Sequence, residues 1–293
     1  NIAKLAGMWT QIASAFADQP ESNLWFEIEN EPHDKFNDSN LLKVLSPALA
    51  EIRKSNPTRP VIIGGEFWSG GLNLGSIESR AASSAAHIYG KQTVFAEAFT
   101  SFNDFSKHPY VIKRRGEELF CEGINHFVLH VSGHQPRDGV PGLNVFGTAF
   151  HRNTPWFSHS RAWTRYLQRC HLMLRQGEPV ADTAVYIGDF APQMTGPANP
   201  VPPGYDYDYI NSDVLLKRAR VENGELVVPA ENNPARIAAR YKMVAMPTDP
   251  AAQQMRPQVR ARIEEMKKQG AVFVDGVPVT AQTMQDLKIV PLV

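Results

Sequence analysis

The sequence lacks the features that mark disulfide-rich, nucleic-acid-binding and membrane-spanning proteins. It has 2 cysteines in 293 residues, too few for a disulfide framework or for a zinc site built from cysteine alone. Its 30 basic and 30 acidic residues cancel, so no basic field favours nucleic acid. No apolar run approaches the roughly 18 residues that a membrane helix needs. We therefore expect a neutral or small-molecule substrate, with no nucleic acid and no membrane as partner.

Two further patterns are missing. Residues 1–17 have neither the basic start nor the continuous apolar core of a signal peptide, and their apolar spacing predicts an amphipathic helix instead. No glycine-rich phosphate loop follows the strand expected at 241–247, so the sequence gives no reason to expect a nucleotide there.

The order of the expected elements favours parallel β-sheet. Strands and helices alternate over the first half of the chain, with strands at 24–32, 61–68, 92–101 and 124–136 and helices at 40–54, 76–90 and 107–120. This order predicts right-handed crossovers between parallel strands. We expect an α/β fold: a partial (β/α)8 TIM-barrel-like region over 1–200 and a second, incomplete α/β domain over 201–293.

Polar side chains gather where the expected strands end. Glu31 ends the first strand, Glu97 lies in the third, and His130, His134 and Gln135 follow the fourth. Active sites of parallel barrels lie at these carboxyl ends, and cleavage of a glycosidic bond needs two carboxyl groups. Glu31 and Glu97 are the candidate pair. The alternative is structural: a Glu on an apolar strand is often salt-bridged, and the histidines can hydrogen-bond to loop backbone.

The strand that ends at Glu31 carries two more carboxylates on the same face. Glu27 and Glu29 share the pleat face of Glu31, because side chains alternate along a strand. If all three point into a barrel, their repulsion should raise at least one pKa, as a general acid requires.

The first quarter of the chain resembles glycoside hydrolase family 5, the cellulase family. The resemblance covers roughly residues 1–75, through "MWTQIASAFADQPESNLWFEIENEPH" and "LSPALAEIRKSNPTRPVIIGGEFWSG". It implies that Glu31 is the acid/base of a retaining mechanism, that Asn30 contacts a sugar hydroxyl, and that Trp68 is a stacking platform. His33, directly after the motif, is taken as a further substrate-binding residue, and Glu66 in "GGEFW" as an outside candidate for catalysis.

This first resemblance is incomplete. The three strands that precede the Asn-Glu-Pro motif in family 5 are missing from the sequence. A His-x-Tyr pattern occurs in "HIYG" at 87–90, but it lies too close to Glu97 to belong to the preceding barrel strand. We therefore expect His87 and Tyr89 to be helical.

From about residue 81 the chain resembles glycoside hydrolase family 106, the α-L-rhamnosidases. The motifs that carry this resemblance run in order to the C-terminus: "AASSAAHIYGKQTVFAEAFTS", "GINHFVLHVSGHQP", "PGLNVFGTAFHRNTPWF", "WTRYLQRCHLMLRQGEPVADTAVYIGD" and "PPGYDYDYINSDVLL". The resemblance implies an inverting enzyme with Glu97 as base and with His130, His134 and Gln135 as sugar contacts. It also implies an association with calcium, a flavodoxin-like module over 205–293, and a secreted or periplasmic location.

Three functions follow from these patterns. The first is a β-glucan hydrolase of cellulase type with Glu31 as general acid/base, and the second an α-L-rhamnosidase that uses Glu97. The third is a non-catalytic carbohydrate-binding remnant or chimeric fragment, because about five of the eight strands of a closed barrel are visible. All three take an oligo- or polysaccharide as partner, and the glycosidase chemistry itself requires no cofactor. Carboxyl groups about 5–5.5 Å apart favour retention, and groups about 6.5–9.5 Å apart favour inversion.

Overall fold

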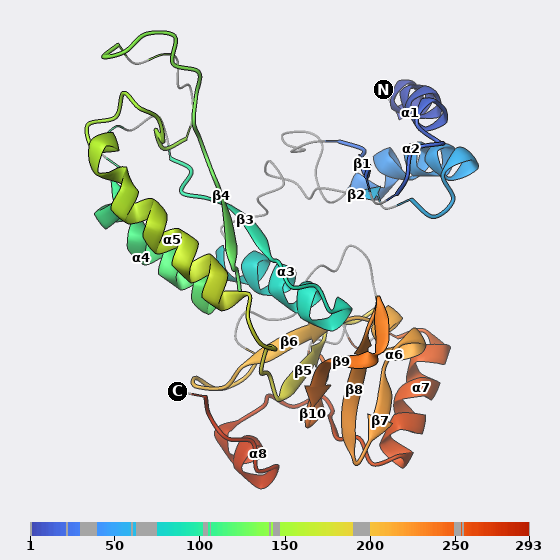
Figure 1. The fold of residues 1–293 in the computed structure, drawn as a ribbon. Coiled ribbons are helices and arrows are strands. Elements are labelled where there is room, and N and C mark those ends of the chain that lie inside the picture. The colour runs from blue at the N-terminus through green and yellow to red at the C-terminus, as the bar shows by residue number, and fades with distance from the viewer. Residues whose placement is uncertain are drawn as a thin grey trace. The chain divides into compact units, whose positions relative to one another are not determined.

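The computed structural model forms two compact units, residues 1–75 and 76–293, which are described separately. The residues that it describes are 2–21, 23–29, 40–59, 61–62, 75–101, 105, 107–140, 142, 147–189, 200–248, 253 and 255–292. The elements within these ranges follow in the order α1 (Ile2–Ala15), β1 (Phe26–Glu27), α2 (Leu41–Ser55), β2 (Val61–Ile62), α3 (Gly75–Tyr89), β3 (Phe95–Ala98), α4 (Pro109–Cys121), β4 (His126–Leu129), the 3₁₀ turn η1 (Phe157–His159), α5 (Ser160–Leu174), β5 (Thr183–Tyr186), β6 (Tyr207–Ile210), α6 (Ser212–Lys217), β7 (Arg220–Glu222), β8 (Glu225–Ala230), β9 (Asn233–Tyr241), β10 (Met243–Ala245), α7 (Pro257–Lys268), β11 (Phe273–Val274) and α8 (Ala281–Asp286) (Figure 1).

In the first unit, α1 and α2 pack on one face of the parallel pair β1–β2. Phe26 lies opposite Val61 in this pair. Trp9 on α1 contacts the Phe26 ring at 5.3 Å and donates its indole N–H to the Ile28 carbonyl at 3.1 Å. Phe26 and Ile28 are buried, whereas Glu27 is exposed and Glu29 half-buried. Glu27 therefore points away from the helices, as expected from the alternation along a strand.

A buried arginine fixes the turn between α1 and β1. Arg59 is 1% exposed. Its guanidinium donates to the backbone carbonyls of Gln19 at 2.6 Å and Leu24 at 2.7 Å, and its Nε donates to Asn56 Oδ1 at 2.6 Å. The five N–H donors of an arginine suit several carbonyls at once, and such bonds are what allow its charge to be buried. Residues 56–59 thus hold the turn between α1 and β1 in place.

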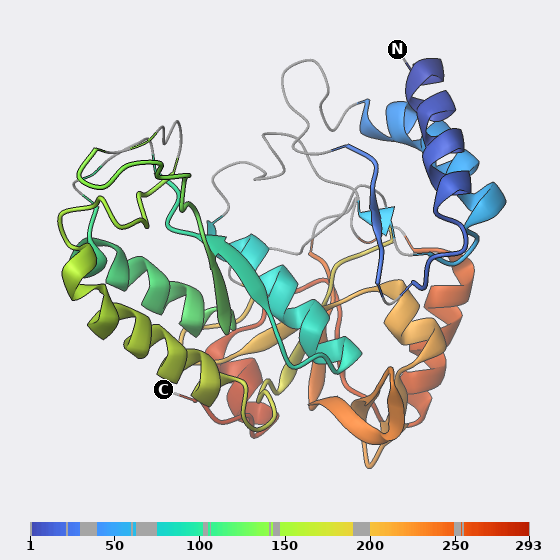
Figure 2. The same ribbon diagram turned by 45° about the horizontal axis from the view of Figure 1, so that its top comes forward.

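In the second unit, β3 and β4 form a parallel pair, and α4 and α5 cover one of its two faces. The two helices lie side by side in both views (Figures 1 and 2). Phe99, Phe127 and Trp163 meet edge to face in the core between strands and helices, with ring centroids 5.1 and 5.8 Å from Phe99. On the opposite face, Phe95 is 58% exposed and Val128 51% exposed.

Helix α3 ends at a glycine, as the sequence predicts. Gly90 has a φ of +70°, a left-handed conformation that costs glycine little, and the Lys91 N–H returns to the Ala86 carbonyl at 2.8 Å. A side chain at Gly90 would also meet Ala230 Cβ at 2.7 Å. His87 and Tyr89 lie in α3, which confirms that they are not strand residues.

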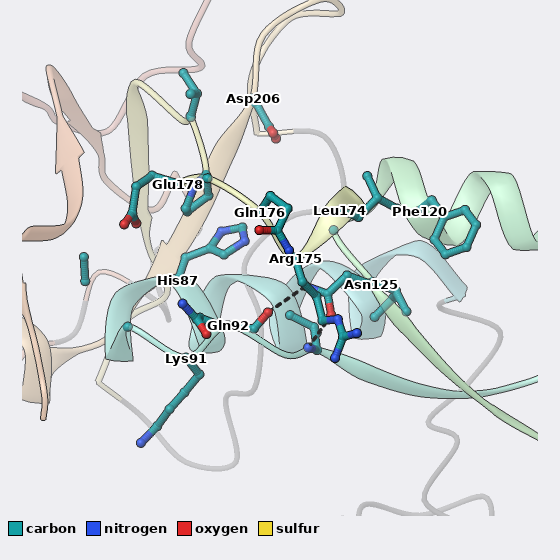
Figure 3. A pocket seen from close by; sticks show the side chains of 18 of the residues that line it. His87, Lys91, Gln92, Phe120, Asn125, Leu174, Arg175, Gln176, Glu178 and Asp206 are labelled. Atoms are coloured by element: carbon teal, nitrogen blue, oxygen red, sulfur yellow. Dashed lines mark hydrogen bonds between the residues drawn. The ribbon is translucent and has the colours of Figure 1, made fainter. Parts of the chain in front are cut away.

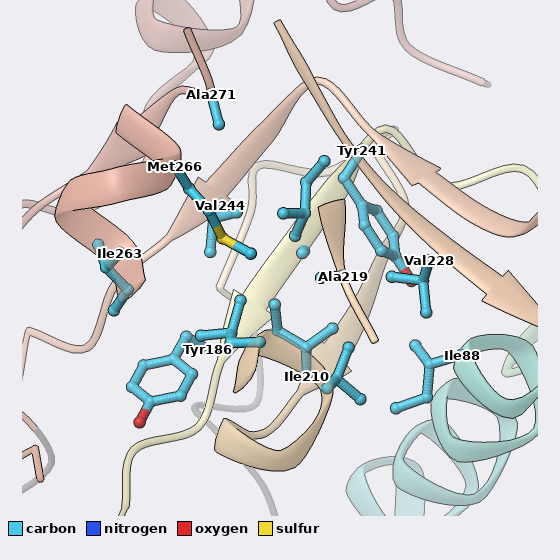
Figure 4. Close-up of a cluster of buried hydrophobic side chains, with 14 of the residues drawn as sticks. Ile88, Tyr186, Ile210, Ala219, Val228, Tyr241, Val244, Ile263, Met266 and Ala271 are labelled. Carbon is cyan, nitrogen blue, oxygen red and sulfur yellow. The ribbon is translucent and has the colours of Figure 1, made fainter. Parts of the chain in front are cut away.

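The C-terminal part is built on a four-stranded parallel sheet with the order β11-β10-β5-β6. Alternate residues of each strand enter different cores. Ala184, Tyr186 and Val244 belong to one core (Figure 4), whereas Val185 and Met243 belong to the core on the other face. Both faces are thus buried, as is usual for parallel sheets.

The sequence analysis did not predict the antiparallel sheet β7-β8-β9 that packs beside this domain. Leu226 lies opposite Tyr241, and both are 1% exposed. A turn at Asn223 and Gly224, both with positive φ, joins β7 to β8. Such an Asn-Gly pair between apolar runs is a strong hairpin signal, and it was overlooked.

The structure confirms a mixed α/β fold with parallel sheets, whereas the (β/α)8 barrel and the boundary near residue 200 stay predictions. The range 1–200, expected as barrel-like, includes β5, and β5 pairs with β10 and β6 in the C-terminal sheet. Its residues are buried on both faces, so they fit the interior of that sheet.

Candidate active site

Glu97 lies in β3 on the face that the helices do not cover. Its side chain is exposed, between the half-buried Ala96 and the buried Ala98 that face α4 and α5. Thr100, just beyond the strand, donates its hydroxyl to Glu97 Oε1 at 3.4 Å. This weak contact leaves the carboxylate open to a ligand. The catalytic role of Glu97 stays a prediction.

The chain segments that follow β3 and β4 are joined to each other by backbone hydrogen bonds. The His130 N–H donates to the Ala98 carbonyl at 3.2 Å, the Val131 N–H to the Thr148 carbonyl at 2.8 Å, and the Thr148 N–H to the His130 carbonyl at 3.1 Å. The His130–Val131 peptide bond is cis. The Thr148 hydroxyl donates to the Phe99 carbonyl. The strand ends are therefore held in a fixed arrangement beside Glu97.

Gly147 packs closely against the His130 ring. It has a φ of +94°, and a β-carbon there would lie 2.6 Å from His130 Nδ1 and 2.9 Å from Val131 Cγ1. Only glycine fits such a position without displacing its neighbours. His130 is half-buried and directly follows β4.

The other two predicted sugar contacts differ from each other. His134 is exposed, whereas Gln135 is 6% exposed and holds its own loop together. Its Oε1 accepts from the Gly142 N–H at 2.9 Å and from Asn153 Nδ2 at 3.0 Å, and its Nε2 donates to the Gly133 carbonyl at 3.1 Å. Gln135 thus has a structural role in the described loop, and its contact with sugar stays a prediction.

The same loop contains a buried histidine that was not predicted from the sequence. His151 is 3% exposed, and its Nδ1 accepts the Asn153 N–H at 3.3 Å, which places the ring proton on Nε2. Burial, with a smaller effect from Arg152, lowers the pKa of His151 below its usual value. The neutral ring contacts Phe105 edge to face at 5.9 Å. Its segment "GTAFHRN" is a loop without a periodic apolar pattern, so the sequence offered no signal for its burial.

The remaining candidates lie outside the described residues. They are Asn30, Glu31, His33, Glu66 and Trp68. Their roles, and the separation of the Glu31 and Glu97 carboxyl groups, stay predictions.

A polar cavity of about 250 Å³ lies at the other ends of β3 and β4 (Figure 3). His87 on α3 reaches into it, and its Nδ1 is 2.8 Å from Oδ1 of Asp208, whose Oδ2 accepts the Tyr241 hydroxyl at 3.0 Å. Arg80 forms an ion pair with Asp206 at 2.7 Å. Burial raises the pKa of Asp206, and Arg80 opposes this shift.

Most of the charged side chains around this cavity form ion pairs with other side chains of the protein. Lys91 pairs with Glu231 at 2.9 Å, and Arg236 pairs with Glu178 at 2.9 Å. The cavity lies at the amino ends of the strands, where parallel barrels carry residues for stability rather than for catalysis. We therefore assign a structural role to this network, which joins α3 to the C-terminal sheet.

Among the residues that the structure describes, no three histidine, cysteine, aspartate or glutamate side chains come close enough together to hold a metal ion. Calcium needs about six to eight oxygen ligands. The calcium that the resemblance implies stays a prediction, with no ligand assigned.

Comparison with known proteins identifies the family. A family profile described as alpha-L-rhamnosidase, glycoside hydrolase family 106, matches residues 53–289. The chain belongs to the alpha-L-rhamnosidase family. The match starts upstream of residue 81, where the sequence analysis placed the beginning of the resemblance.

Three relatives extend this finding. A putative beta-glucuronidase from Formosa agariphila is 32% identical over 223 residues, which cover 75% of this chain and 18% of that protein. The rhamnosidase structure from Novosphingobium sp. PP1Y matches with a TM-score of 0.61 and 29% identity, covering 74% of this chain and 20% of that chain. Endoglucanase H from Acetivibrio thermocellus is 46% identical over 69 residues, 24% of this chain and 8% of that protein.

This member of the alpha-L-rhamnosidase family spans a fifth or less of each of these relatives. The endoglucanase similarity covers a small part of the chain, so membership of family 5 stays an interpretation. In the described ranges, no helix combines the length and the apolar character needed to cross a bilayer.

Proposed function

We propose that this chain is part of a glycosidase that cleaves α-L-rhamnosides, with Glu97 as the carboxylate that moves a proton. One observation carries the proposal. Glu97 lies on the uncovered face of β3, beside the joined ends of β3 and β4, within the range that matches the rhamnosidase family. In a parallel barrel that face lines the interior, where substrate and catalytic groups meet.

The surroundings of Glu97 suit a general base. An exposed carboxylate with one weak hydroxyl contact is free to take a proton from water. In an inverting enzyme the base activates water on one face of the sugar while a second carboxyl group protonates the leaving oxygen. Glu31 is the candidate for this second group. We also propose a carbohydrate as partner and a secreted or periplasmic location, as the resemblance implies.

The test is hydrolysis of two aryl glycosides by the purified chain, 4-nitrophenyl α-L-rhamnoside and 4-nitrophenyl β-cellobioside. We expect cleavage of the rhamnoside and a loss of about 10²- to 10⁴-fold in kcat for Glu97→Gln. The matched control is Glu118→Gln, because Glu118 is an exposed carboxylate on α4 that contacts Arg114 and Arg115. Circular dichroism should show the same fold for all three proteins.

The second candidate function is β-glucan hydrolysis, favoured by the 46% identity to endoglucanase H. Cleavage of the cellobioside alone would replace the rhamnosidase proposal with this function. If the folded chain cleaves neither glycoside, the catalytic proposal is wrong and the carbohydrate-binding remnant is the better description.

A further inference from the structure

An aromatic groove lies between the first turns of α4 and α5. Its volume is about 470 Å³, and its lining is formed by His108, Pro109, Tyr110, Lys113, Trp156, His159, Ala162, Trp163 and Tyr166. Because a crossover helix starts at the end where its preceding strand finishes, both helix starts lie toward the carboxyl ends of β3 and β4. The groove is thus on the same side of this layer as the strand ends that carry the candidate active site.

The groove presents several aromatic rings, of which Trp156 and Tyr166 are held by hydrogen bonds. Tyr110 is 87% exposed and lies nearly parallel to His108, with an interplanar angle of 19°. Trp156 donates its indole N–H to the Lys107 carbonyl at 3.0 Å, which fixes that ring. Tyr166 stacks on the buried Trp163 at 5.6 Å and donates its hydroxyl to Glu117 at 3.0 Å. Most of the Tyr110 side chain is therefore open to a ligand.

Charge and size limit the class of ligand. Lys113 lies 5.0 Å from the Tyr166 ring centre, and its charge is neutralised by the ion pair with Glu117. The lining therefore suits an uncharged ligand. Its volume is that of a small-molecule pocket rather than a protein interface.

We propose that this groove binds a 6-deoxyhexose ring, such as one rhamnose unit of a polysaccharide substrate, at a place separate from the catalytic position. The C–H face of a pyranose is apolar and can stack on Tyr110 or Trp156, while the methyl group that replaces the 6-hydroxyl fits beside Pro109 and Ala162. The choice of sugar rests on the proposed function. The stacking itself requires only the groove.

The test is affinity electrophoresis of the Glu97→Gln chain in native gels containing rhamnogalacturonan or hydroxyethylcellulose. The Glu97→Gln substitution is included so that the protein does not digest the polysaccharide in the gel. We expect retardation by rhamnogalacturonan and not by hydroxyethylcellulose. Free L-rhamnose should relieve it better than L-mannose, which differs from L-rhamnose by a 6-hydroxyl group.

Variants of the groove assign the binding. Tyr110→Ala should weaken retardation about fivefold to tenfold, because one aromatic contact is lost from an exposed position. Tyr110→Phe keeps the ring face and should bind like its parent. Phe157→Ala is the matched control, because Phe157 is an exposed aromatic on η1 that does not line the groove.

Each contrary outcome has a distinct meaning. No retardation of the parent, or equal retardation of Tyr110→Ala, overturns the groove as a sugar site. Retardation by hydroxyethylcellulose alone, or equal competition by L-mannose, overturns the 6-deoxyhexose. If Glu97→Gln still hydrolyses rhamnoside while Tyr110→Ala abolishes retardation, the role of Glu97 fails and the groove stands.

Discussion

The sheet of β3 and β4 and the sheet of β11, β10, β5 and β6 are both parallel, but they differ in how many faces are covered. The C-terminal sheet buries alternate residues in two cores, and Val244 in its centre is 0% exposed. The β3–β4 pair is covered by helices on one face, and its other face shows Phe95, Val128 and the carboxylate of Glu97.

This difference separates stability from function. A carboxylate in the C-terminal sheet would have to be buried and paired, as Asp208 is with His87 and Tyr241. A carboxylate on the open face of β3 keeps its access to substrate. Parallel sheets are almost always covered on both faces, and in the described residues the β3–β4 pair departs from this rule by leaving Phe95 and Val128 exposed.

The largest effect is expected on the free energy of unfolding when one valine of each sheet is replaced by alanine. Val244→Ala removes two methyl groups from a full core and should lower the free energy of unfolding by about 2 kcal/mol. Val128→Ala, at a half-exposed position, should change it by less than about 0.5 kcal/mol. Urea denaturation measures both. If the two losses are equal, the face of β4 is covered in solution.

A smaller effect on stability, combined with an effect on the site, is expected at Gly147. Gly147→Ala should cost about 1–2 kcal/mol for the left-handed conformation, and its methyl group would displace His130. The control is Gly139→Ala, because Gly139 has a φ of +71° with no atom within 4 Å of an added β-carbon. Both variants should lose stability, but only Gly147→Ala should lower kcat/KM for the rhamnoside.

The smallest effect concerns pH. Burial, with smaller effects from His126 and Arg175, lowers the pKa of His171 below 6.5. Below that pH the unfolded chain binds more protons than the native one, so stability is lost as pH falls from about 6.5 toward the lower native pKa. His171→Leu should make the decline between pH 7.5 and 5.5 shallower.

The sequence predicted α3, β3, α4 and β4 well, because their apolar residues repeat with clear periods, whereas the sheet β7-β8-β9 was not predicted. Helix α3 and its end at Gly90 follow from composition and spacing alone. Sheet membership was harder. β5 reads like any buried parallel strand, and only its partners β6 and β10, which lie far along the chain, show which sheet it joins.

The candidate site was predicted in part. Glu97 lies on a strand face where the period-two alternation places it, so its position could be predicted locally. The structural role of Gln135 could not, because its partners Gly142 and Asn153 depend on how the loop folds back. His151 was overlooked for the same reason, since burial in a loop leaves no periodic pattern.

Helix α3 has a consequence for how the second unit unfolds. Ala86 packs in the core of the β3–β4 layer, Ile88 packs in the core of the C-terminal sheet, and the Ser84 hydroxyl accepts the Tyr209 N–H at 3.0 Å. Neither layer can melt without exposing one side of this shared helix. Residues 76–293 should therefore unfold in a single cooperative transition, and a protease that cuts between the two layers should release no independently stable fragment.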